Sequence, residues 1–201
     1  MSRDEETLRV YDARAAEYAR VTATTAPGDL LSAFIAALPA GARVLDLGCG
    51  PGTDAGHMAA AGLVVEAVDA SEPMVSLARA QDGVAARQAD FDMFAAEGHT
   101  GIYHGIWANF SLLHAPRAAL PGYLAAIHAA LQPDGLFHIA VKTGTGEARD
   151  RLGRVYSYYM PDELSALLDQ AGLAPQSMAQ GRDQGLDGTL ADWVAIRAKR
   201  A

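Results

Sequence analysis

One stretch, Val44-Leu45-Asp46-Leu47-Gly48-Cys49-Gly50-Pro51-Gly52, is the most informative in this chain of 201 residues. An apolar run typical of a buried strand ends at Leu47, and three glycines follow within the next five residues. Glycine accepts positive φ and lets the backbone approach a ligand closely. The spacing G-x-G-x-G differs from the G-x-G-x-x-G of dinucleotide-binding folds. The stretch therefore predicts a strand, a ligand-binding loop and a helix that starts at once.

Short apolar runs alternate with helical patterns along the rest of the chain. We expect strands at residues 43–47, 63–68, 84–89, 102–108 and 136–142. We expect helices at residues 4–20, 30–38, 53–61 and 116–131, and helices that start near residues 71 and 161. Residues 173–182 and 191–199 are expected to form a final antiparallel pair. This alternation predicts an α/β fold with a doubly wound, mostly parallel sheet in a single domain, residues 1–201.

Composition excludes several classes of protein. Half of the residues are hydrophobic, which is enough for a sizeable core, and the net charge of −8 disfavours a nucleic-acid partner. The single cysteine, Cys49, excludes an intramolecular disulfide. The acidic N-terminus is unlike a signal peptide, and no apolar run reaches the length of a membrane span. We therefore expect a cytoplasmic protein without a membrane partner.

Acidic residues follow two further predicted strands. Asp69 ends the second strand, 23 residues beyond Asp46, at the spacing where nucleotide-binding folds place an acid on ribose hydroxyls. Asp90 and Phe91 follow the third strand, where an acid and an aromatic ring suit an adenine. The carboxyl ends of parallel strands meet at one edge of the sheet, so these residues predict a single ligand site.

Together these motifs resemble those of class I S-adenosylmethionine-dependent methyltransferases, of the small-molecule type found in bacteria. The resemblance is strong over residues 40–142. It implies a seven-stranded sheet of order 3-2-1-4-5-7-6, with strand 7 antiparallel and helices on both faces. It also implies an N-terminal lid, residues 1–38, and an acceptor-side insertion, residues 143–160. In the turn Leu131-Gln132-Pro133-Asp134-Gly135, Asp134 replaces a glycine of the family pattern, which Asp tolerates.

The resemblance implies S-adenosylmethionine as the cofactor. It implies that Gly48, Gly50 and Gly52 line its methionine and sugar, that Asp69 takes the ribose hydroxyls, and that Asp90 and Phe91 flank the adenine. We expect the cofactor site to include further residues on the same strand ends and the lid: Tyr18, Asp46, Cys49, Ala70, Met74, Ala108 and Asn109. No metal site is expected.

The acceptor side carries less specific signals. His114 follows the fourth strand and is the best candidate for a general base, with Tyr11 as a second catalytic candidate. In the insertion, Arg154, Tyr156 and Tyr158 are candidates for substrate binding. The sequence lacks the Asn/Asp-Pro-Pro-Tyr and Pro-Cys motifs of DNA methyltransferases. We therefore expect methyl transfer to an oxygen or nitrogen of a small molecule.

Three alternatives stay open at this point. The chain is consistent with a protein that binds S-adenosylmethionine or its demethylated product without turnover. A nucleotide-dependent oxidoreductase is disfavoured by the glycine spacing. The third alternative is a methyltransferase that acts on a protein or tRNA. The sequence shows no evident recognition domain or basic arm for such a substrate. The chain is expected to be a monomer or a homodimer.

Overall fold

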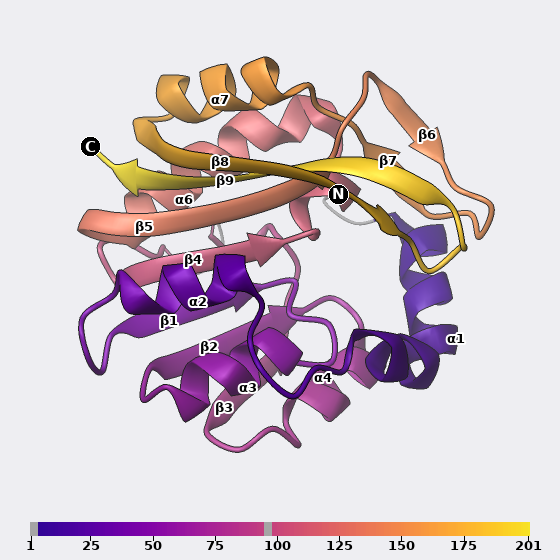
Figure 1. The fold of residues 1–201 in the computed structure, drawn as a ribbon, viewed down its shortest axis with the longest axis horizontal. Coiled ribbons are helices and arrows are strands. Elements are labelled where there is room, and N and C mark those ends of the chain that lie inside the picture. The colour runs from indigo at the N-terminus through magenta and orange to yellow at the C-terminus, as the bar shows by residue number, and fades with distance from the viewer. Residues whose placement is uncertain (1–3, 95–97) are drawn as a thin grey trace.

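A computed structural model describes residues 4–94 and 98–201. Its centre is a seven-stranded sheet of order β3-β2-β1-β4-β5-β9-β8 (Figure 1). The strands from β3 to β5 are parallel, and β9 is antiparallel to both β5 and β8. In sheet order their bounds are Val84–Gln88, Val64–Asp69, Arg43–Leu47, Tyr103–Asn109, Leu131–Lys142, Leu190–Arg200 and Leu173–Gln184. The expected order is confirmed, with β8 and β9 as the sixth and seventh strands of this sheet.

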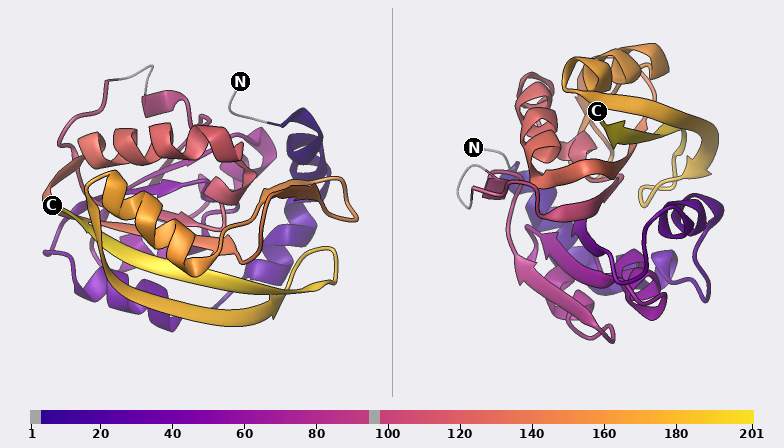
Figure 2. Two further views of the ribbon diagram at one scale, coloured as in Figure 1. Left: turned by 90° about the horizontal axis from the view of Figure 1, so that it is seen from above. Right: turned by 90° about the vertical axis from the view of Figure 1, so that its left-hand side faces the viewer.

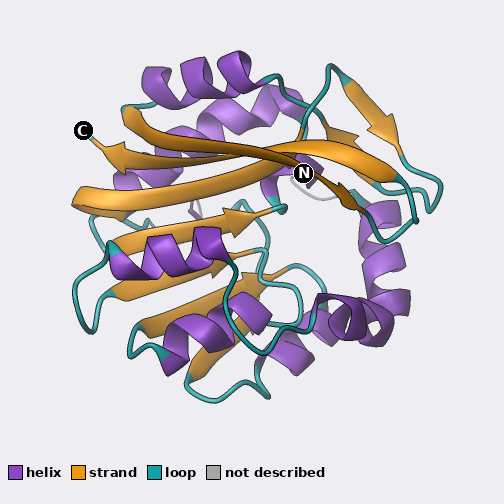
Figure 3. Ribbon diagram, viewed as in Figure 1, coloured by secondary structure: helices purple, strands orange, loops and turns teal. Residues whose placement is uncertain are grey.

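Helices cover both faces of the sheet (Figures 1 and 3). One buried apolar cluster packs α2 and α3 against β1 and β2, and a second packs α6 and α7 against β4, β5 and β9. Helix α1 lies beyond the carboxyl ends of the parallel strands instead, as the views in Figure 2 also show. The helix bounds are α1 Glu5–Thr22, α2 Asp29–Ala36, α3 Thr53–Ala60, α4 Glu72–Ala78, α6 Leu120–Ala130 and α7 Pro161–Gln170.

Local sequence explains where the site-forming helices begin. Asp4 caps α1 by accepting a hydrogen bond from the backbone N–H of Thr7 at 2.8 Å. Ser71 caps α4 in the same way, and Pro73 lies in its first turn. Helix α1 has a kink at Arg14, where φ is −118° and ψ is 15°. The kink bends the helix across the end of the sheet.

Three expected elements differ from the structure. Residues 143–160 contain a hairpin, β6 (Glu147–Arg149) and β7 (Val155–Ser157), that is separate from the main sheet. The helix expected from Pro116 begins only at Leu120, after 3₁₀ turns at Leu112–His114 and Arg117–Ala119, because Pro116 is extended. Strand β5 starts at Leu131 instead of Leu136, because Leu131 already pairs with Tyr103 of β4. The turn at Asp134, whose φ is 65°, lies within the strand.

In the described part of the chain, no helix has the length and apolar character that crossing a membrane requires.

Candidate active site

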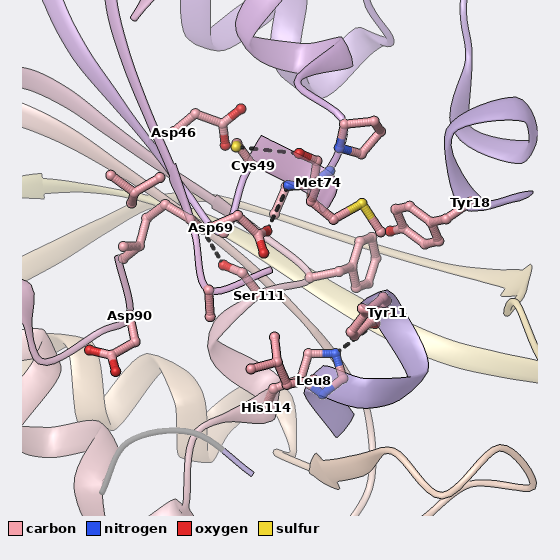
Figure 4. Close-up of a pocket in the computed structure, with 18 of the residues that line it drawn as sticks. Leu8, Tyr11, Tyr18, Asp46, Cys49, Asp69, Met74, Asp90, Ser111 and His114 are labelled. Atoms are coloured by element: carbon pink, nitrogen blue, oxygen red, sulfur yellow. Dashed lines mark hydrogen bonds between the residues drawn. The ribbon is translucent and has the colours of Figure 1, made fainter. Parts of the chain in front are cut away.

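A cavity of about 370 Å³ opens at the carboxyl ends of β1 to β4, with α1 along one side (Figure 4). It is lined by residues of the glycine loop, of the strand ends and of α1. The predicted site residues among them are Tyr11, Tyr18, Asp46, Gly48, Cys49, Gly50, Asp69, Ala70, Met74, Asp90, Phe91, Asn109 and His114.

Backbone geometry in the loop explains the first two glycines. The N–H groups of Gly48 and Cys49 both donate to the Val68 carbonyl, at 2.8 and 2.9 Å, which folds the loop onto β2. Gly48 has φ of 78°, and a Cβ there would lie 2.3 Å from the Ser111 Cβ. Gly50 has φ of 53°, and a Cβ there would lie 3.4 Å from Cε1 of the Tyr18 ring. A side chain at either position would strain the loop, and at Gly48 it would also collide with Ser111.

Two predicted cofactor residues do not line the cavity. The third glycine, Gly52, has φ of 79°, and a Cβ there would lie 2.8 Å from the Ala78 Cα. Its absent side chain therefore lets α3 and α4 pack closely. Ala108 is fully buried in β4. Cys49 does line the cavity, but its thiol is buried and donates to the Gly50 carbonyl at 3.4 Å. The thiol therefore serves the packing of the loop.

Asp69, at the end of β2, is held in place by two backbone N–H groups. Its Oδ2 accepts from the Gly50 N–H at 2.9 Å (Figure 4), and its Oδ1 accepts from the Ser71 N–H at 2.9 Å. Burial raises the pKa of the carboxyl, while the two N–H donors act in the opposite direction. Each oxygen keeps a lone pair for a further donor. The carboxyl is thus held in place with capacity for two ligand hydroxyls.

A second carboxyl lies deeper in the cavity with unused capacity. Asp46 is 3% exposed, and among the described residues its Oδ2 has no hydrogen-bond partner. Burial raises its pKa well above the usual range, and the nearby carboxyls of Asp54 and Asp69 raise it further. A cationic ligand group would relieve this unfavourable field.

Asp54 belongs to a buried hydrogen-bonded chain that supports the floor of the cavity. Its Oδ2 accepts from Trp107 Nε1 at 2.8 Å and from Asn109 Nδ2 at 3.3 Å. Asn109 Oδ1 in turn lies 3.3 Å from His138 Nε2, and the His138 ring stacks on Trp107 with centroids 3.6 Å apart. Burial lowers the pKa of His138 to about 3, so this imidazole stays neutral.

The third strand end forms the far wall of the cavity. The Asp90 side chain accepts from the backbone N–H of Asp92 at 3.1 Å, which orders the turn after β3. The neighbouring Phe91 ring lies 5.7 Å from the Tyr123 ring. Met74, at the start of α4, is buried and adds apolar surface (Figure 4). An acid, an aromatic ring and a thioether therefore surround this end.

The two catalytic candidates are in contact. Tyr11 Oη lies 2.8 Å from His114 Nε2 (Figure 4). His114 Nδ1 lies 2.7 Å from the Val155 carbonyl, which can only accept, so Nδ1 carries the ring hydrogen of the neutral imidazole. Nε2 is then an acceptor for the Tyr11 hydroxyl. Burial lowers the pKa of His114 to about 4.

The three predicted substrate residues lie outside the cavity lining. Arg154 is 2% exposed and forms an ion pair with Asp150, so it is unavailable to a free acceptor. Tyr156 is buried beside it, with its ring centroid 4.8 Å from that of His114. Tyr158 lies on the far side of Tyr156, with ring centroids 6.2 Å apart. The segment 143–160 therefore packs behind Tyr11 and His114 instead of presenting these side chains to the cavity.

Sequence reasoning missed several lining residues. Phe110 has φ of 54°, which is rare for an aromatic residue and typical of functional sites. Ser111 donates to the Leu47 carbonyl and packs against Gly48. Helix α1 and its N-cap add lining residues on both sides of the kink at Arg14, and within each part residues three or four positions apart share the cavity face: Asp4, Thr7, Leu8 and Tyr11 before the kink, Tyr18 and Thr22 after it.

The chemistry of the lining fits S-adenosylmethionine. Gly48 and Gly50 place loop backbone on the cavity wall, and Asp69 has capacity for two hydroxyls. The unpartnered oxygen of Asp46 suits an ammonium group. Acidic residues surround this half of the cavity, as a ligand with a sulfonium and an ammonium requires.

Comparison with known sequences identifies the family. The sequence model of a family described as a methyltransferase domain matches residues 15–177. The chain belongs to this methyltransferase family. The match confirms the resemblance drawn from the glycine loop, together with the family's cofactor, S-adenosylmethionine.

Curated relatives of this methyltransferase include a ubiquinone biosynthesis O-methyltransferase of Xanthomonas axonopodis pv. citri (strain 306). The two are 29% identical over 67% of this chain and 64% of that protein. A second such enzyme, from Thiobacillus denitrificans (strain ATCC 25259 / T1), is 32% identical over 48% of this chain and 42% of its own length. The match therefore spans less than two thirds of either relative.

Solved structures match the methyltransferase over nearly its whole length. The 1,6-didemethyltoxoflavin-N1-methyltransferase of Burkholderia thailandensis, with bound 1,6-didemethyltoxoflavin and S-adenosylhomocysteine, is 25% identical. The match covers 98% of this chain and 88% of that one, with a TM-score of 0.78. The [4+2]-cyclase SpnF has a TM-score of 0.75 at 15% identity, over 100% of this chain and 97% of its own. At that identity the likeness shows the fold alone.

Proposed function

We propose that this protein transfers a methyl group from S-adenosylmethionine to a hydroxyl or ring N–H of a small molecule. Bound in the cavity, the cofactor supplies an electrophilic methyl group on a sulfonium. The protein's residues hold both reactants in line, exclude water and remove a proton from the acceptor. The observation that carries this proposal is the cavity itself, with acids along its cofactor half and a Tyr11–His114 pair at its other end.

In the half of the cavity proposed for the cofactor, each polar side chain has a proposed partner on S-adenosylmethionine. Asp69 would take the ribose hydroxyls through the lone pairs that the loop leaves open. Asp46 would face the ammonium group, and Asp90 and Phe91 would flank the adenine. Tyr18 would cover the cofactor from the α1 side, with its ring next to Gly50. These roles match those that the family resemblance implies.

At the other end, the pair supplies a base for a protic acceptor. A neutral His114 has a free-base Nε2 over the whole physiological pH range, because its pKa is about 4. Its proton affinity is low, so it suits an acceptor whose hydroxyl or ring N–H is acidic, such as a phenol or a heteroaromatic ring. A phenol acceptor is the class that the name of the curated relatives suggests, and a ring nitrogen the class that the name of the solved neighbour suggests.

The experiment is an acceptor panel with S-adenosylmethionine, read by release of S-adenosylhomocysteine and by the mass of the methylated product. The probes are ortho-dihydroxybenzoates, 1,6-didemethyltoxoflavin, aliphatic amines, bulk tRNA and a denatured protein mixture. We expect turnover with one of the first two classes and its loss in His114→Gln. Methylation of tRNA or protein alone would contradict the proposal.

One alternative has support from a specific observation. The fold of SpnF, named as a cyclase, shows that this architecture is not confined to proteins named as methyltransferases. A protein that binds S-adenosylmethionine without transferring its methyl group would bind it with Asp69-dependent affinity and stay inactive across the whole panel. The cytoplasmic location and the oligomeric state stay predictions from the sequence.

A further inference from the structure

The β6–β7 hairpin carries a buried ion pair that the cavity does not use directly. The Arg154 and Asp150 side chains are 2% and 5% exposed. Arg154 Nε and Nη2 both donate to Asp150 Oδ2, at 2.9 and 2.6 Å. Asp150 Oδ1 accepts backbone N–H bonds from the same turn. Because burying two charges costs about as much as their attraction returns, stability alone is weak grounds for such a pair.

The remaining donor of Arg154 points at the catalytic pair. Its Nη1 donates to Tyr11 Oη at 3.1 Å. A guanidinium has no acceptor, so the Tyr11 oxygen must accept there. The hydroxyl hydrogen of Tyr11 is then available to His114 Nε2, which lies 2.8 Å away and has a free lone pair in the Nδ1–H tautomer.

The hydrogen bonds therefore run in one direction, from Arg154 to Tyr11 to His114 and on to the Val155 carbonyl. Val155 directly follows Arg154 in the chain, so both ends of this series belong to the same short strand region. A shift of the hairpin would change both ends together.

Helix α1 must be docked for this arrangement to exist. The backbone N–H of Val155 donates to Thr7 Oγ1 at 2.8 Å. Arg149 donates to both carboxylate oxygens of Asp4, at 2.9 and 2.7 Å. These contacts lie one and two turns before Tyr11 on the same helix, so they hold its hydroxyl in front of Arg154.

We propose that Arg154, held by Asp150, is a positioning residue that aims the Tyr11 hydroxyl hydrogen at His114 and so completes the base. The inference rests on the proposed methyl transfer. In the proton step, the acceptor gives its proton to Tyr11 Oη while Tyr11 gives its own to His114 Nε2. Tyr11 is unchanged overall, and His114 carries the one proton that the reaction releases. The positive Arg154 stabilises the negative charge that develops on Tyr11 Oη.

A simpler role for Arg154 is to fix the hairpin turn, with no influence on the proton of Tyr11. The two roles differ in a measurable way. If Arg154 acts through Tyr11, its removal changes the electronic state of His114 Nε2 only while the Tyr11 hydroxyl is present. If it only fixes the turn, the effects of the two substitutions on Nε2 are independent.

The test is ¹⁵N NMR of the full-length, histidine-labelled protein, without ligand and with S-adenosylhomocysteine. The His114 signals are assigned by their absence in His114→Gln. Four variants are compared with the wild type: Tyr11→Phe, Arg154→Met, the double variant, and Arg151→Met, an exposed arginine of the same turn. If Arg154→Met does not fold, Asp150→Asn replaces it in the comparison. This substitution removes the charge that holds Arg154, and the asparagine side chain has nearly the shape of aspartate.

We expect the wild type to show the Nδ1–H tautomer and a hydrogen-bonded Nε2. Tyr11→Phe moves the Nε2 signal toward that of a free lone pair, Arg154→Met gives at least half of this shift, and the double variant gives no more than Tyr11→Phe. Arg151→Met leaves the signal in place. An unchanged Nε2 in Arg154→Met, or fully additive shifts, would overturn the inference.

Kinetics give a second readout with an acceptor from the panel. We expect Arg154→Met to lower kcat at least tenfold and to leave S-adenosylhomocysteine affinity within twofold. Arg154→Lys, which keeps the charge, is expected to restore part of kcat. Full activity in Arg154→Met would also overturn the inference. Because the NMR result needs no methyl transfer, failure of the proposed function is distinguishable from failure of this one.

Discussion

Tyr11 and His114 are 103 positions apart in the sequence, yet Tyr11 Oη lies 2.8 Å from His114 Nε2. Tyr11 comes from the N-terminal helix, and His114 from the turn after β4. The end of the cavity that we propose to be catalytic is therefore assembled from two distant segments. The residues proposed to bind the cofactor, in contrast, come mostly from the consecutive strand ends of the sheet.

Loss of either member of this pair should affect turnover more than cofactor binding. We expect Tyr11→Phe and His114→Gln each to lower kcat by about 10² or more, the range of a general base. The affinity for S-adenosylhomocysteine should stay within twofold. The double variant should be little slower than either single variant, because the two residues act as one unit. Wild-type turnover in His114→Gln would remove it from the mechanism.

Asp69 should control cofactor affinity. We expect Asp69→Ala to weaken S-adenosylmethionine binding at least tenfold, or about 1.4 kcal/mol, because the ribose contacts and the anchor of Gly50 are both lost. Asp169→Ala, an exposed acid on α7, is the matched control and should bind as the wild type does. Equal affinities for the two variants in calorimetric titration would refute the ribose assignment.

Asp46 should lower the stability of the ligand-free protein and strengthen the binding of S-adenosylmethionine. Its pKa is raised in the folded protein, so the folded state binds more protons than the unfolded state above pH 4, and stability falls as the pH rises from there. We expect Asp46→Asn to raise the Tm of the ligand-free protein at pH 8, by about 2 to 4 °C for each 1 kcal/mol recovered. The gain should be smaller at pH 5. The same variant should bind S-adenosylmethionine more weakly, and a lower Tm at pH 8 would contradict the account.

The buried imidazole of His138 should give stability the opposite dependence on pH. Its pKa of about 3 lies below the usual value of 6.5, so the unfolded state binds more protons between these values. The contribution of the neutral imidazole to the free energy of unfolding is complete above pH 6.5 and is lost progressively as the pH falls toward 3. Urea denaturation at several pH values should show a shallower loss on acidification in His138→Gln. An identical slope would show that His138 is not held neutral.

Gly48 should be intolerant of a side chain. Its positive φ and the close approach of Ser111 predict that Gly48→Ala destabilises the fold by about 1–3 kcal/mol. Gly122→Ala is the matched control, because that position lies in α6 with open space around it. Alanine there should leave stability unchanged or raise it by up to about 1 kcal/mol. Equal unfolding temperatures for the two variants would contradict the loop geometry.

The fold was largely readable from the sequence because its signals are local. Buried strands such as Val64–Asp69 are short runs rich in β-branched residues, and caps such as Ser71 mark the helix starts. The β6–β7 hairpin was missed because three-residue strands leave no periodic pattern. The late start of α6 follows from the extended conformation of Pro116, which composition alone does not indicate.

That the acids at the strand ends lie at one cavity was predictable for the same reason. Asp46 and Asp69 stand at strand ends, where topology alone brings them together. The direction of Arg154 was not predictable, because its ion pair with Asp150 depends on how the hairpin folds. Gly52 reads as a ligand glycine, but the structure uses it for the packing of α3 on α4.

The most direct test of the central claim is calorimetric titration of the purified protein with S-adenosylmethionine, S-adenosylhomocysteine and NAD in parallel, for the wild type and Asp69→Ala. The account predicts micromolar binding of the first two ligands by the wild type, at least tenfold weaker binding by the variant, and no binding of NAD. Folded wild-type protein that binds neither sulfur ligand, or that binds NAD equally well, would contradict it.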